Sequence, residues 1–515
     1  MTTEEQQNNK RIAKNTLLLY FRMLFTMCVG LYTSRIVLQN LGVEDFGIYN
    51  VVGGVVAMFS LLSGSLSAAI SRFFTYELGK GNVANLKKIF SSAISIQLIL
   101  SVVIIILAET IGVWFLNNKM NIPEIRLDSA NWVLHLSIAT FCVNLLSVPY
   151  NAAIIAHERM SAFAYVSVFE VLGKLVIALG ITFSPIDKLC FYAILMCLVS
   201  LVIRLIYGWY CKRHFEECEC HIVLDFPFLK KMFGFAGWNF IGASSAVLRD
   251  QGGNILINLF CGPVVNAARG IAFQVNNAVS QFVNNFMVAL NPQITKSYAS
   301  ENYSYMMTLI FRGARLSFFM LLLLSLPILF NTEYILSLWL KTVPEHACFF
   351  VQLVLMFAMS ESISNPLITA MLATGDIRNY QIIVGGLQLM NLPVGYFLLK
   401  MGFFPEIVLI VAICISQLCL FARILLLKKM IQLDVLLYLK NVYLKVLLVS
   451  VLSSILPFVA KKFFITAESP LRFVCLVFLC IFCSTIVILF LGCDKEERGF
   501  IVSKIIALKK KVLAR

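Results

Sequence analysis

The sequence has 515 residues, of which 60% are hydrophobic and 13% charged, with 42 Lys and Arg against 27 Asp and Glu. A soluble domain carries about 25% charged residues, so this composition excludes a soluble protein and indicates an all-α integral membrane protein. The formal net charge of +15 does not indicate a nucleic-acid partner, because the basic residues gather in short loops between apolar runs. That pattern is typical of loops next to a cytoplasmic leaflet.

Apolar runs of about 20 residues, the length needed to cross a bilayer, follow one another along the whole chain. We predict fourteen transmembrane helices with short connections and no soluble domain. Their expected ranges are 15–39, 46–70, 89–116, 130–155, 161–183, 188–211, 232–258, 264–290, 308–330, 348–373, 379–400, 404–427, 441–460 and 471–492. The first run lacks a short apolar core followed by a cleavage site, so we expect an uncleaved first helix.

Lys and Arg are distributed unequally between alternate loops. One set of loops, which includes both termini, holds 28 of the 42, and the opposite set holds eight. The excess of positive charge marks the cytoplasmic side, so both termini are predicted to be cytoplasmic. The cysteines lie mostly inside apolar runs without the spacing of a secreted framework, and we expect free thiols.

An internal repeat divides the chain into two halves of six spans each. The matching segments are 40–42 and 260–262, 71–75 and 291–295, and 147–153 and 364–370, at offsets of 220, 220 and 217 residues. Parallel repeats of this kind occur in secondary transporters, with the substrate site between the halves. We therefore expect six-helix bundles at 1–213 and 231–430, a cytoplasmic linker at 214–230, and accessory helices with a basic cytoplasmic tail at 431–515.

The stretch from Lys231 to Pro292 has the wrong composition for helices that face lipid. It holds nine asparagines as well as Arg249 and Asp250. At about 100° per residue, six polar side chains fall within about 80° of arc: Asn266, Arg269, Asn277, Ser280, Asn284 and Asn291. Buried amides and charges are costly unless they face partners or water. We interpret this face as the wall of a polar cavity; alternatively, the amides bond helix to helix.

Further ionisable residues lie inside the predicted spans. Arg22 lies deep in the first span, and Glu170 and Lys174 are spaced i, i+4 in the fifth, where they could also satisfy each other as an ion pair. The predicted substrate-binding residues are Arg22, Arg249, Arg269, Asn266, Asn277, Asn284 and Lys174. Candidates for taking up a coupling proton or sodium ion are Asp250, Glu361 and Glu170. The cationic excess favours an anionic ligand, and the planar donor fork of Arg suits phosphate.

Motifs of common enzymes and cofactor sites are missing from the sequence. It contains no P-loop, His157-Glu158 lacks the second His of a zinc-protease motif, and no nucleophile elbow occurs. We expect no enzyme activity, no cofactor and no bound metal. One loop has zinc-type ligands, but their spacing matches no common zinc site, and it could simply cap the link between the halves: Cys211, His214, Cys218, Cys220 and His221.

Three segments and the two-half layout give the chain a family resemblance. They are Leu31–Gly42 (LYTSRIVLQNLG), Asp45–Tyr49 (DFGIY) and Leu290–Ile294 (LNPQI). The chain resembles polysaccharide flippases of the Wzx type, in the superfamily that also holds lipid II flippases and multidrug and toxin extruders. The resemblance implies two pseudo-symmetric six-helix bundles in a V, with two C-terminal helices as in the lipid II type.

The resemblance also implies what is moved and where. The substrate would be an oligosaccharide on a polyprenyl pyrophosphate, moved by alternating access to the outer leaflet of a bacterial inner membrane for surface polysaccharides such as O-antigen lipopolysaccharide. Arginines line the cavity of the lipid II type on spans one, two and eight. Arg22 and Arg269 fit spans one and eight, whereas span two has only Arg72, at its cytoplasmic end.

The partners implied are the lipid-linked substrate, the bilayer, a polymerase and glycosyltransferases, and we expect a monomer without nucleic acid. Two other functions remain open. A cation-coupled multidrug extruder has the same fold, but its site would be expected to carry unpaired acids and aromatics instead of arginines. A non-transporting scaffold of a polysaccharide synthase complex would need none of the cavity charges.

Overall fold

The computed structural model describes residues 3–57, 59–119, 122–219, 225–340, 343–464, 470–494 and 497–499. Within these ranges every regular element is a helix. Eleven of the helical segments are long and apolar enough to cross a membrane. The predicted class, an all-α integral membrane protein, is therefore confirmed.

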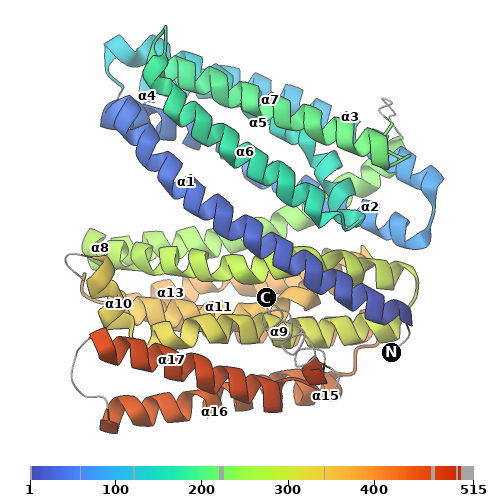
Figure 1. Cartoon of the computed structure of the whole chain (residues 1–515), viewed down its shortest axis with the longest axis vertical. Coiled ribbons are helices and arrows are strands. Elements are labelled where there is room, and N and C mark those ends of the chain that lie inside the picture. Colours follow the sequence, from blue (N-terminus) through green and yellow to red (C-terminus); the bar gives the residue numbers. More distant parts are fainter. Residues whose placement is uncertain are drawn as a thin grey trace, which may run out of the picture. The chain divides into compact units, whose positions relative to one another are not determined.

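The helices follow one another with short connections (Figure 1). Those before residue 220 are α1 (Thr3–Ala57), α2 (Ser60–Lys80), α3 (Val83–Leu107), α4 (Val113–Lys119), α5 (Leu127–Ala156), α6 (Met160–Gly180) and α7 (Lys188–His214). Those after it are α8 (Phe226–Ala299), α9 (Tyr303–Phe330), α10 (Thr332–Trp339), α11 (Ala347–Thr374), α12 (Arg378–Leu389), α13 (Asn391–Lys400), α14 (Ile407–Ile431), α15 (Val435–Tyr438), α16 (Lys445–Val459) and α17 (Pro470–Val487).

Three of the fourteen predicted spans are missing from the eleven apolar segments: 46–70, 232–258 and 264–290. The structure is helical there too, since the first lies in α1 and α2 and the other two lie in α8. The first is apolar but is divided between two helices, whereas the two in α8 fall short in hydropathy because glycines, amides and charged residues replace aliphatic ones. The count of fourteen is therefore approximate, and the two polar segments of α8 differ from the rest in composition.

The chain folds into two compact units. The first holds residues 1–244, 288–302 and 375–377, and the second holds 245–287, 303–374 and 378–515. Helix α8 thus belongs to the second unit in its middle and to the first at both ends. The boundaries of these units differ from those of the bundles predicted from the repeat, 1–213 and 231–430.

The internal repeat is also visible in the backbone conformation. Gly42 interrupts α1 with φ 83° and ψ 169°, and Gly262 interrupts α8 with φ 83° and ψ 178°. Nine described residues have positive φ, and six of them form pairs at the repeat offsets: Gly42 and Gly262, Gly81 and Glu301, and Glu158 and Gly375. Glycine adopts this region without steric cost. The two halves therefore bend and turn at equivalent positions.

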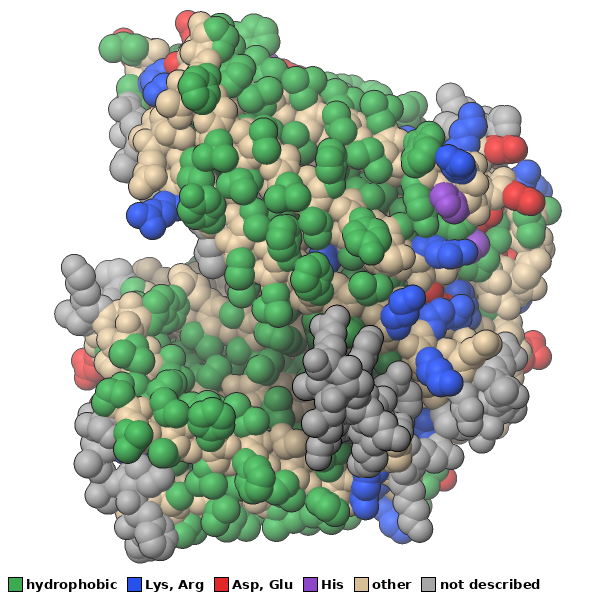
Figure 2. All heavy atoms as spheres, viewed as in Figure 1, with side chains coloured by type: hydrophobic (Ala, Val, Ile, Leu, Met, Phe, Trp, Pro, Cys, Tyr) green, Lys and Arg blue, Asp and Glu red, His purple; other side chains and the backbone are tan. Residues whose placement is uncertain are grey.

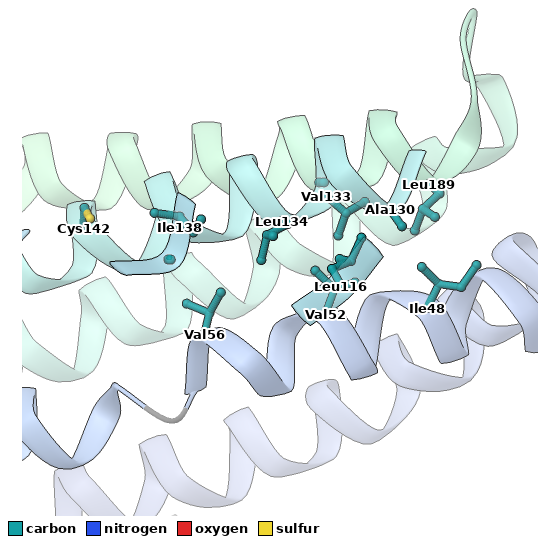
Figure 3. Packing of buried hydrophobic residues seen from close by; sticks show 12 residues of the cluster. Ile48, Val52, Val56, Leu116, Ala130, Val133, Leu134, Ile138, Cys142 and Leu189 are labelled. Carbon is teal, nitrogen blue, oxygen red and sulfur yellow. The ribbon is translucent and has the colours of Figure 1, made fainter. Parts of the chain in front are cut away.

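The core of the first unit is built from one face of each helix. Ile48 and Val52 of α1 pack beside Leu116 of α4 and Leu134 and Ile138 of α5 (Figure 3). All five side chains are nearly inaccessible. Burying such a side chain contributes about 1.5–3 kcal/mol relative to leaving it in water. Across the helices' middle, Figure 2 shows a largely apolar outer surface, which suits contact with lipid tails.

Charged residues meet near the ends of the predicted spans. Arg126 donates from Nη2 to Asp45 at 2.8 Å and also pairs with Asp187, and all three belong to loops on the predicted outer side. Burial opposes ionisation of Asp187, but hydrogen bonds from Cys190 N–H and from Arg126 outweigh it and lower the pKa of this carboxyl. His346 and Glu406, 2.6 Å apart, form the corresponding contact in the second unit.

Candidate substrate-binding site

Arg269, in the second half of α8, is buried, with 6% of its surface exposed. Its Nη1 donates to Asn254 Oδ1 at 3.1 Å, and its Nη2 donates to the backbone carbonyl of Asp250 at 2.9 Å. The guanidinium also lies 4.2 Å from the centre of the Phe273 ring. Its Nε has no hydrogen-bond partner among the described residues. One nitrogen of this buried cation therefore lacks a hydrogen-bond acceptor among the described residues.

Glycines make this contact between residues far apart in α8 possible. Because α8 is interrupted at Gly262, its second half returns toward the first, and residue 269 reaches residue 250. Gly253 leaves room for the guanidinium, since a Cβ there would lie 3.3 Å from Arg269 Nη2. A cavity of about 20 Å³ adjoins these residues, which is room for about one water molecule.

Arg249 and Asp250 form an ion pair between neighbours in the chain. Arg249 Nε lies 2.9 Å from Asp250 Oδ1, with 13% of the Arg and 41% of the Asp side chain exposed. Arg249 also lies over the Phe357 ring, 4.9 Å from its centre. The carboxylate of the predicted coupling residue Asp250 is thus held by its own neighbour, on the same helix as Arg269.

The second half of α8 carries a continuous exposed polar face. Exposed positions recur at 267, 270, 274, 277, 281 and 284, which cover about 100° of arc at about 100° per residue. Four of them are amides: Gln274, Asn277, Gln281 and Asn284. Such side chains inside a membrane face water or protein in preference to lipid. The predicted residues Asn277 and Asn284 lie on this face.

The predicted stripe and the exposed face overlap only in part. Asn266 is half-buried, and its Oδ1 has no partner among the described residues, whereas Arg269 is buried at the edge of the face. The exposed face is displaced from the predicted one and takes in Gln274 and Gln281, which the sequence analysis missed. Counting glutamine together with asparagine would have found both.

In the first unit the predicted cation Arg22 lies between α1 and α6. Its Nη1 donates to Ser167 Oγ at 3.2 Å, and its guanidinium stacks on Phe163, 4.6 Å from the ring centre. Lys174 Nζ and Glu170 Oε1 are 2.6 Å apart, each side chain 35% exposed. The ion pair considered from their spacing is therefore formed. Three ionisable residues thus lie in the middle of two apolar helices, and each is partly exposed.

A buried cluster of α11 and α14 in the second unit was not predicted. Arg423, within the predicted span 404–427, is 1% exposed inside α14 and donates to Ser364 Oγ at 2.9 Å. Lys428 and Lys429, which follow it, are the residues that mark the helix end. Glu361 interacts electrostatically with Arg423 and Arg249, and its Oε1 is buried without a hydrogen-bond partner among the described residues.

The cysteine- and histidine-rich loop is only partly described, because Cys220 and His221 lie outside the described residues. Among the described ones, no three potential ligands come together. The pKa of the Cys218 thiol is raised by its hydrogen bond with Cys211 and by burial. A thiol that resists ionisation is a poor metal ligand. The fourteen described cysteines are free, as predicted.

An all-helical fold with eleven helical segments long and apolar enough to cross a membrane defines a multi-pass membrane protein. The chain belongs to the polysaccharide biosynthesis protein family, whose model matches residues 12–298. The uncharacterized membrane protein EpsK of Bacillus subtilis (strain 168) is 19% identical to it over 306 residues, which are 59% of this chain and 60% of that protein. The predicted resemblance to Wzx-like members of the superfamily is thereby confirmed.

Solved transporter structures share the fold. A crystal structure of MATE in the straight conformation superposes with a TM-score of 0.70 at 13% identity, covering 84% of this chain and 99% of that one. A multidrug resistance MATE family transporter in an outward-facing conformation also gives 0.70 at 13% identity, with 84% and 98% covered. A transporter of the MOP superfamily from Pyrococcus furiosus, described as having a binding pocket of reverse polarity, gives 0.69 at 13% identity, with 84% and 98% covered.

Proposed function

We propose that this transporter is a flippase that moves a polyprenyl-pyrophosphate-linked oligosaccharide from the cytoplasmic to the outer leaflet of a bacterial inner membrane by alternating access, for synthesis of a surface polysaccharide. The observation that carries the proposal is Arg269, a buried guanidinium with an unused donor beside a small cavity. Membership of a polysaccharide biosynthesis family supports a lipid-linked sugar as the cargo.

The headgroup is what needs the protein, because the polyprenyl tail can stay in lipid throughout. Moving a single ion from water into a medium of low dielectric costs on the order of 20 kcal/mol before relaxation. Arginines replace lost hydration with charge-assisted hydrogen bonds to phosphate, and amides such as those of Asn277 and Asn284 suit sugar hydroxyls. An inside-negative potential further favours outward movement of an anion, by roughly 2.3 kcal/mol per charge per 100 mV.

Extrusion of organic cations, the second function considered for this fold, has less support from the charges. Asp250 is held by Arg249, and Glu170 is held by Lys174. Glu361 lies close to two arginines. Each of these three acids thus already has a cation next to it, whereas Arg269 has a hydrogen-bond donor without an acceptor among the described residues. Glu361 remains our proposed coupling group, because its Oε1 is buried without a hydrogen-bond partner among the described residues.

Replacement of Arg269 tests the proposal. Arg269→Ala should lower translocation at least about tenfold, since a charge-assisted hydrogen bond contributes about 1.5–3 kcal/mol. Arg269→Lys should keep part of the activity, because it retains the charge but not the planar fork. Surface polysaccharide is measured in a strain that lacks its own flippase, with expression checked. Arg213→Ala, at an exposed arginine, is the control, and full complementation by Arg269→Ala would contradict the proposal.

A further inference from the structure

Glu158, in the turn between α5 and α6, is the centre of an ionic contact in which its own carboxylate is fully buried. Its carboxylate, with 0% of the side chain exposed, lies 2.7 Å from Arg11 Nε and 2.7 Å from Lys296 Nζ. Gln293 Nε2 donates to it at 2.7 Å, and Asn15 Nδ2 donates to its backbone carbonyl at 3.2 Å. We call these five residues the ionic clasp. It joins the first repeat to the last turns of α8, which belong to the second repeat.

The repeat places a second contact at the equivalent positions. Gly375, the counterpart of Glu158 at the offset of 217, approaches Arg72 so closely that a Cβ on it would lie 2.5 Å from Arg72 Nη2. Arg72 stacks on Phe73, Tyr76 and Phe235, with its guanidinium 4.7, 4.8 and 5.7 Å from the ring centres. We call these five residues the aromatic clasp.

Four of the five positions of the two clasps correspond, but the arginines do not, since the counterparts of Arg11 and Arg72 are Lys231 and Pro292. At the offset of 220, Phe73 matches Gln293, Tyr76 matches Lys296, and Phe235 matches Asn15. Glu158 and Gly375 even share positive φ, 58° and 82°. For a non-glycine residue this backbone is strained, and such strain persists only where the surroundings impose it. Each clasp therefore ties one half of the chain to the other at four equivalent positions, once with charges and once with aromatic rings.

Equivalent positions also touch each other directly. A Cβ on Gly79 would lie 2.9 Å from Cβ of Ala299, its own counterpart at the offset of 220, and 2.9 Å from Cα of Lys296. Contact between equivalent positions occurs where a twofold axis passes. The pseudo-twofold axis of the repeat therefore runs past Gly79 and Ala299, with one clasp on each side. All these residues lie in the first unit.

We propose that the ionic and aromatic clasps are the two symmetric parts of one gate, which closes the cytoplasmic end and opens as a unit when the transporter admits substrate from that side. The proposal rests on the alternating access of the proposed function. The clasps and the close approach of Gly79 between them hold the same two halves together, so loosening one clasp loosens the other across the axis.

Hydrogen exchange of the purified full-length protein in lipid nanodiscs tests the gate without any substrate. Glu158→Gln and, independently, Lys296→Gln should each speed exchange at least about tenfold, equivalent to about 1.4 kcal/mol, in segments 8–18 and 288–302. The same acceleration is expected in segments 70–80 and 372–377, around the unaltered aromatic clasp. Faster exchange confined to the ionic clasp, or no change at either clasp, would overturn the proposal.

Two matched controls separate the gate from general loosening. Glu301→Gln alters a glutamate that has the same backbone conformation, φ 59°, but an exposed side chain, and should leave exchange unchanged. Gly79→Ala should act like Glu158→Gln, whereas Gly234→Ala, where a Cβ meets nothing within 4 Å, should not. Since no substrate is present, these results stand apart from the translocation assay, whose failure would count against the cargo alone.

Discussion

Arg269 shows how a cation can be kept in an apolar protein and still be available to a ligand. Its two Nη donors are fixed by Asn254 and the Asp250 carbonyl, so the guanidinium stays in place without a carboxylate of its own. A carboxylate partner would neutralise it and compete with an incoming phosphate. Fixed orientation also lowers the entropy lost on binding.

The amide face of α8 makes a prediction at the same scale. Asn277→Leu and Asn284→Leu should each reduce translocation several-fold, because each removes hydrogen-bond donors and acceptors from an exposed face without touching the core. Ala278→Leu, at an exposed neighbour, adds similar bulk without removing an amide and is the control. Translocation is measured in proteoliposomes alongside thermal stability. Equal loss in all three variants would show that bulk, and not hydrogen bonding, matters there.

Accessory helix α17 is held in place through the segment that follows it. Asp494 Oδ2 lies 2.6 Å from Arg315 Nη2, and Oδ1 lies 2.7 Å from Lys445 Nζ. Arg315, inside α9, is 3% exposed. An arginine buried to this extent loses stability if its partner is removed. This ion-pair network therefore connects α9, α16 and the end of α17.

The pH dependence of this anchor follows from Asp494. Burial opposes its ionisation, but hydrogen bonds from Lys445 and Arg315 lower its pKa below the ordinary 3.8. A lowered pKa stabilises the folded state above the unfolded value, and the benefit disappears as the pH falls through the folded value. Asp494→Asn should thus lower the melting temperature by a constant amount from neutral pH down to about pH 5. The difference should shrink as the pH falls below the ordinary pKa and vanish below the lowered folded-state pKa.

The measurement is thermal unfolding of the detergent-purified protein, with Glu345→Gln, at an exposed acid, as the control. A difference that grows on acidification would contradict the assignment of Asp494 as an ionised anchor. Because this carboxylate is 40% exposed, solvent screens part of its interaction, so a shift of a few degrees is expected.

Those elements of the fold that depend on a local sequence pattern were predictable. Apolar runs gave the helices, and the matches at 40–42 and 260–262 marked the glycines at which α1 and α8 bend. The burial of Arg423 and Arg315 was not predicted, because the sequence shows that a charge lies near a helix end, but not which partner buries it. The ionic clasp was not predicted, since Glu158 is 143 residues from Asn15 and 138 from Lys296 along the chain.

At the scale of the whole molecule, charged residues occur in three environments: the helix ends, the two clasps and the interior of the helices. Loop charges pair at the helix ends, as Arg126 does with Asp45. The clasps contain charged and aromatic residues of both repeats. A few arginines in the interior keep hydrogen-bond donors that have no acceptor among the described residues. From the sequence, these interior cations could be predicted only as an excess of arginine within spans. Their contacts, such as that between Arg269 and Asn254, depend on how α8 folds back on itself.

The most direct test of the central claim, that cationic residues within the membrane receive a pyrophosphate headgroup, is translocation in proteoliposomes by the purified protein. Three cargoes are compared: an oligosaccharide on polyprenyl pyrophosphate, the same oligosaccharide on a neutral polyprenyl carrier, and an organic-cation dye. We predict movement of the pyrophosphate-linked compound at least about tenfold faster than the neutral one, in line with one charge-assisted contact, and a strong loss with Arg269→Ala. Equal rates for the first two cargoes, or transport of the dye alone, would contradict the claim.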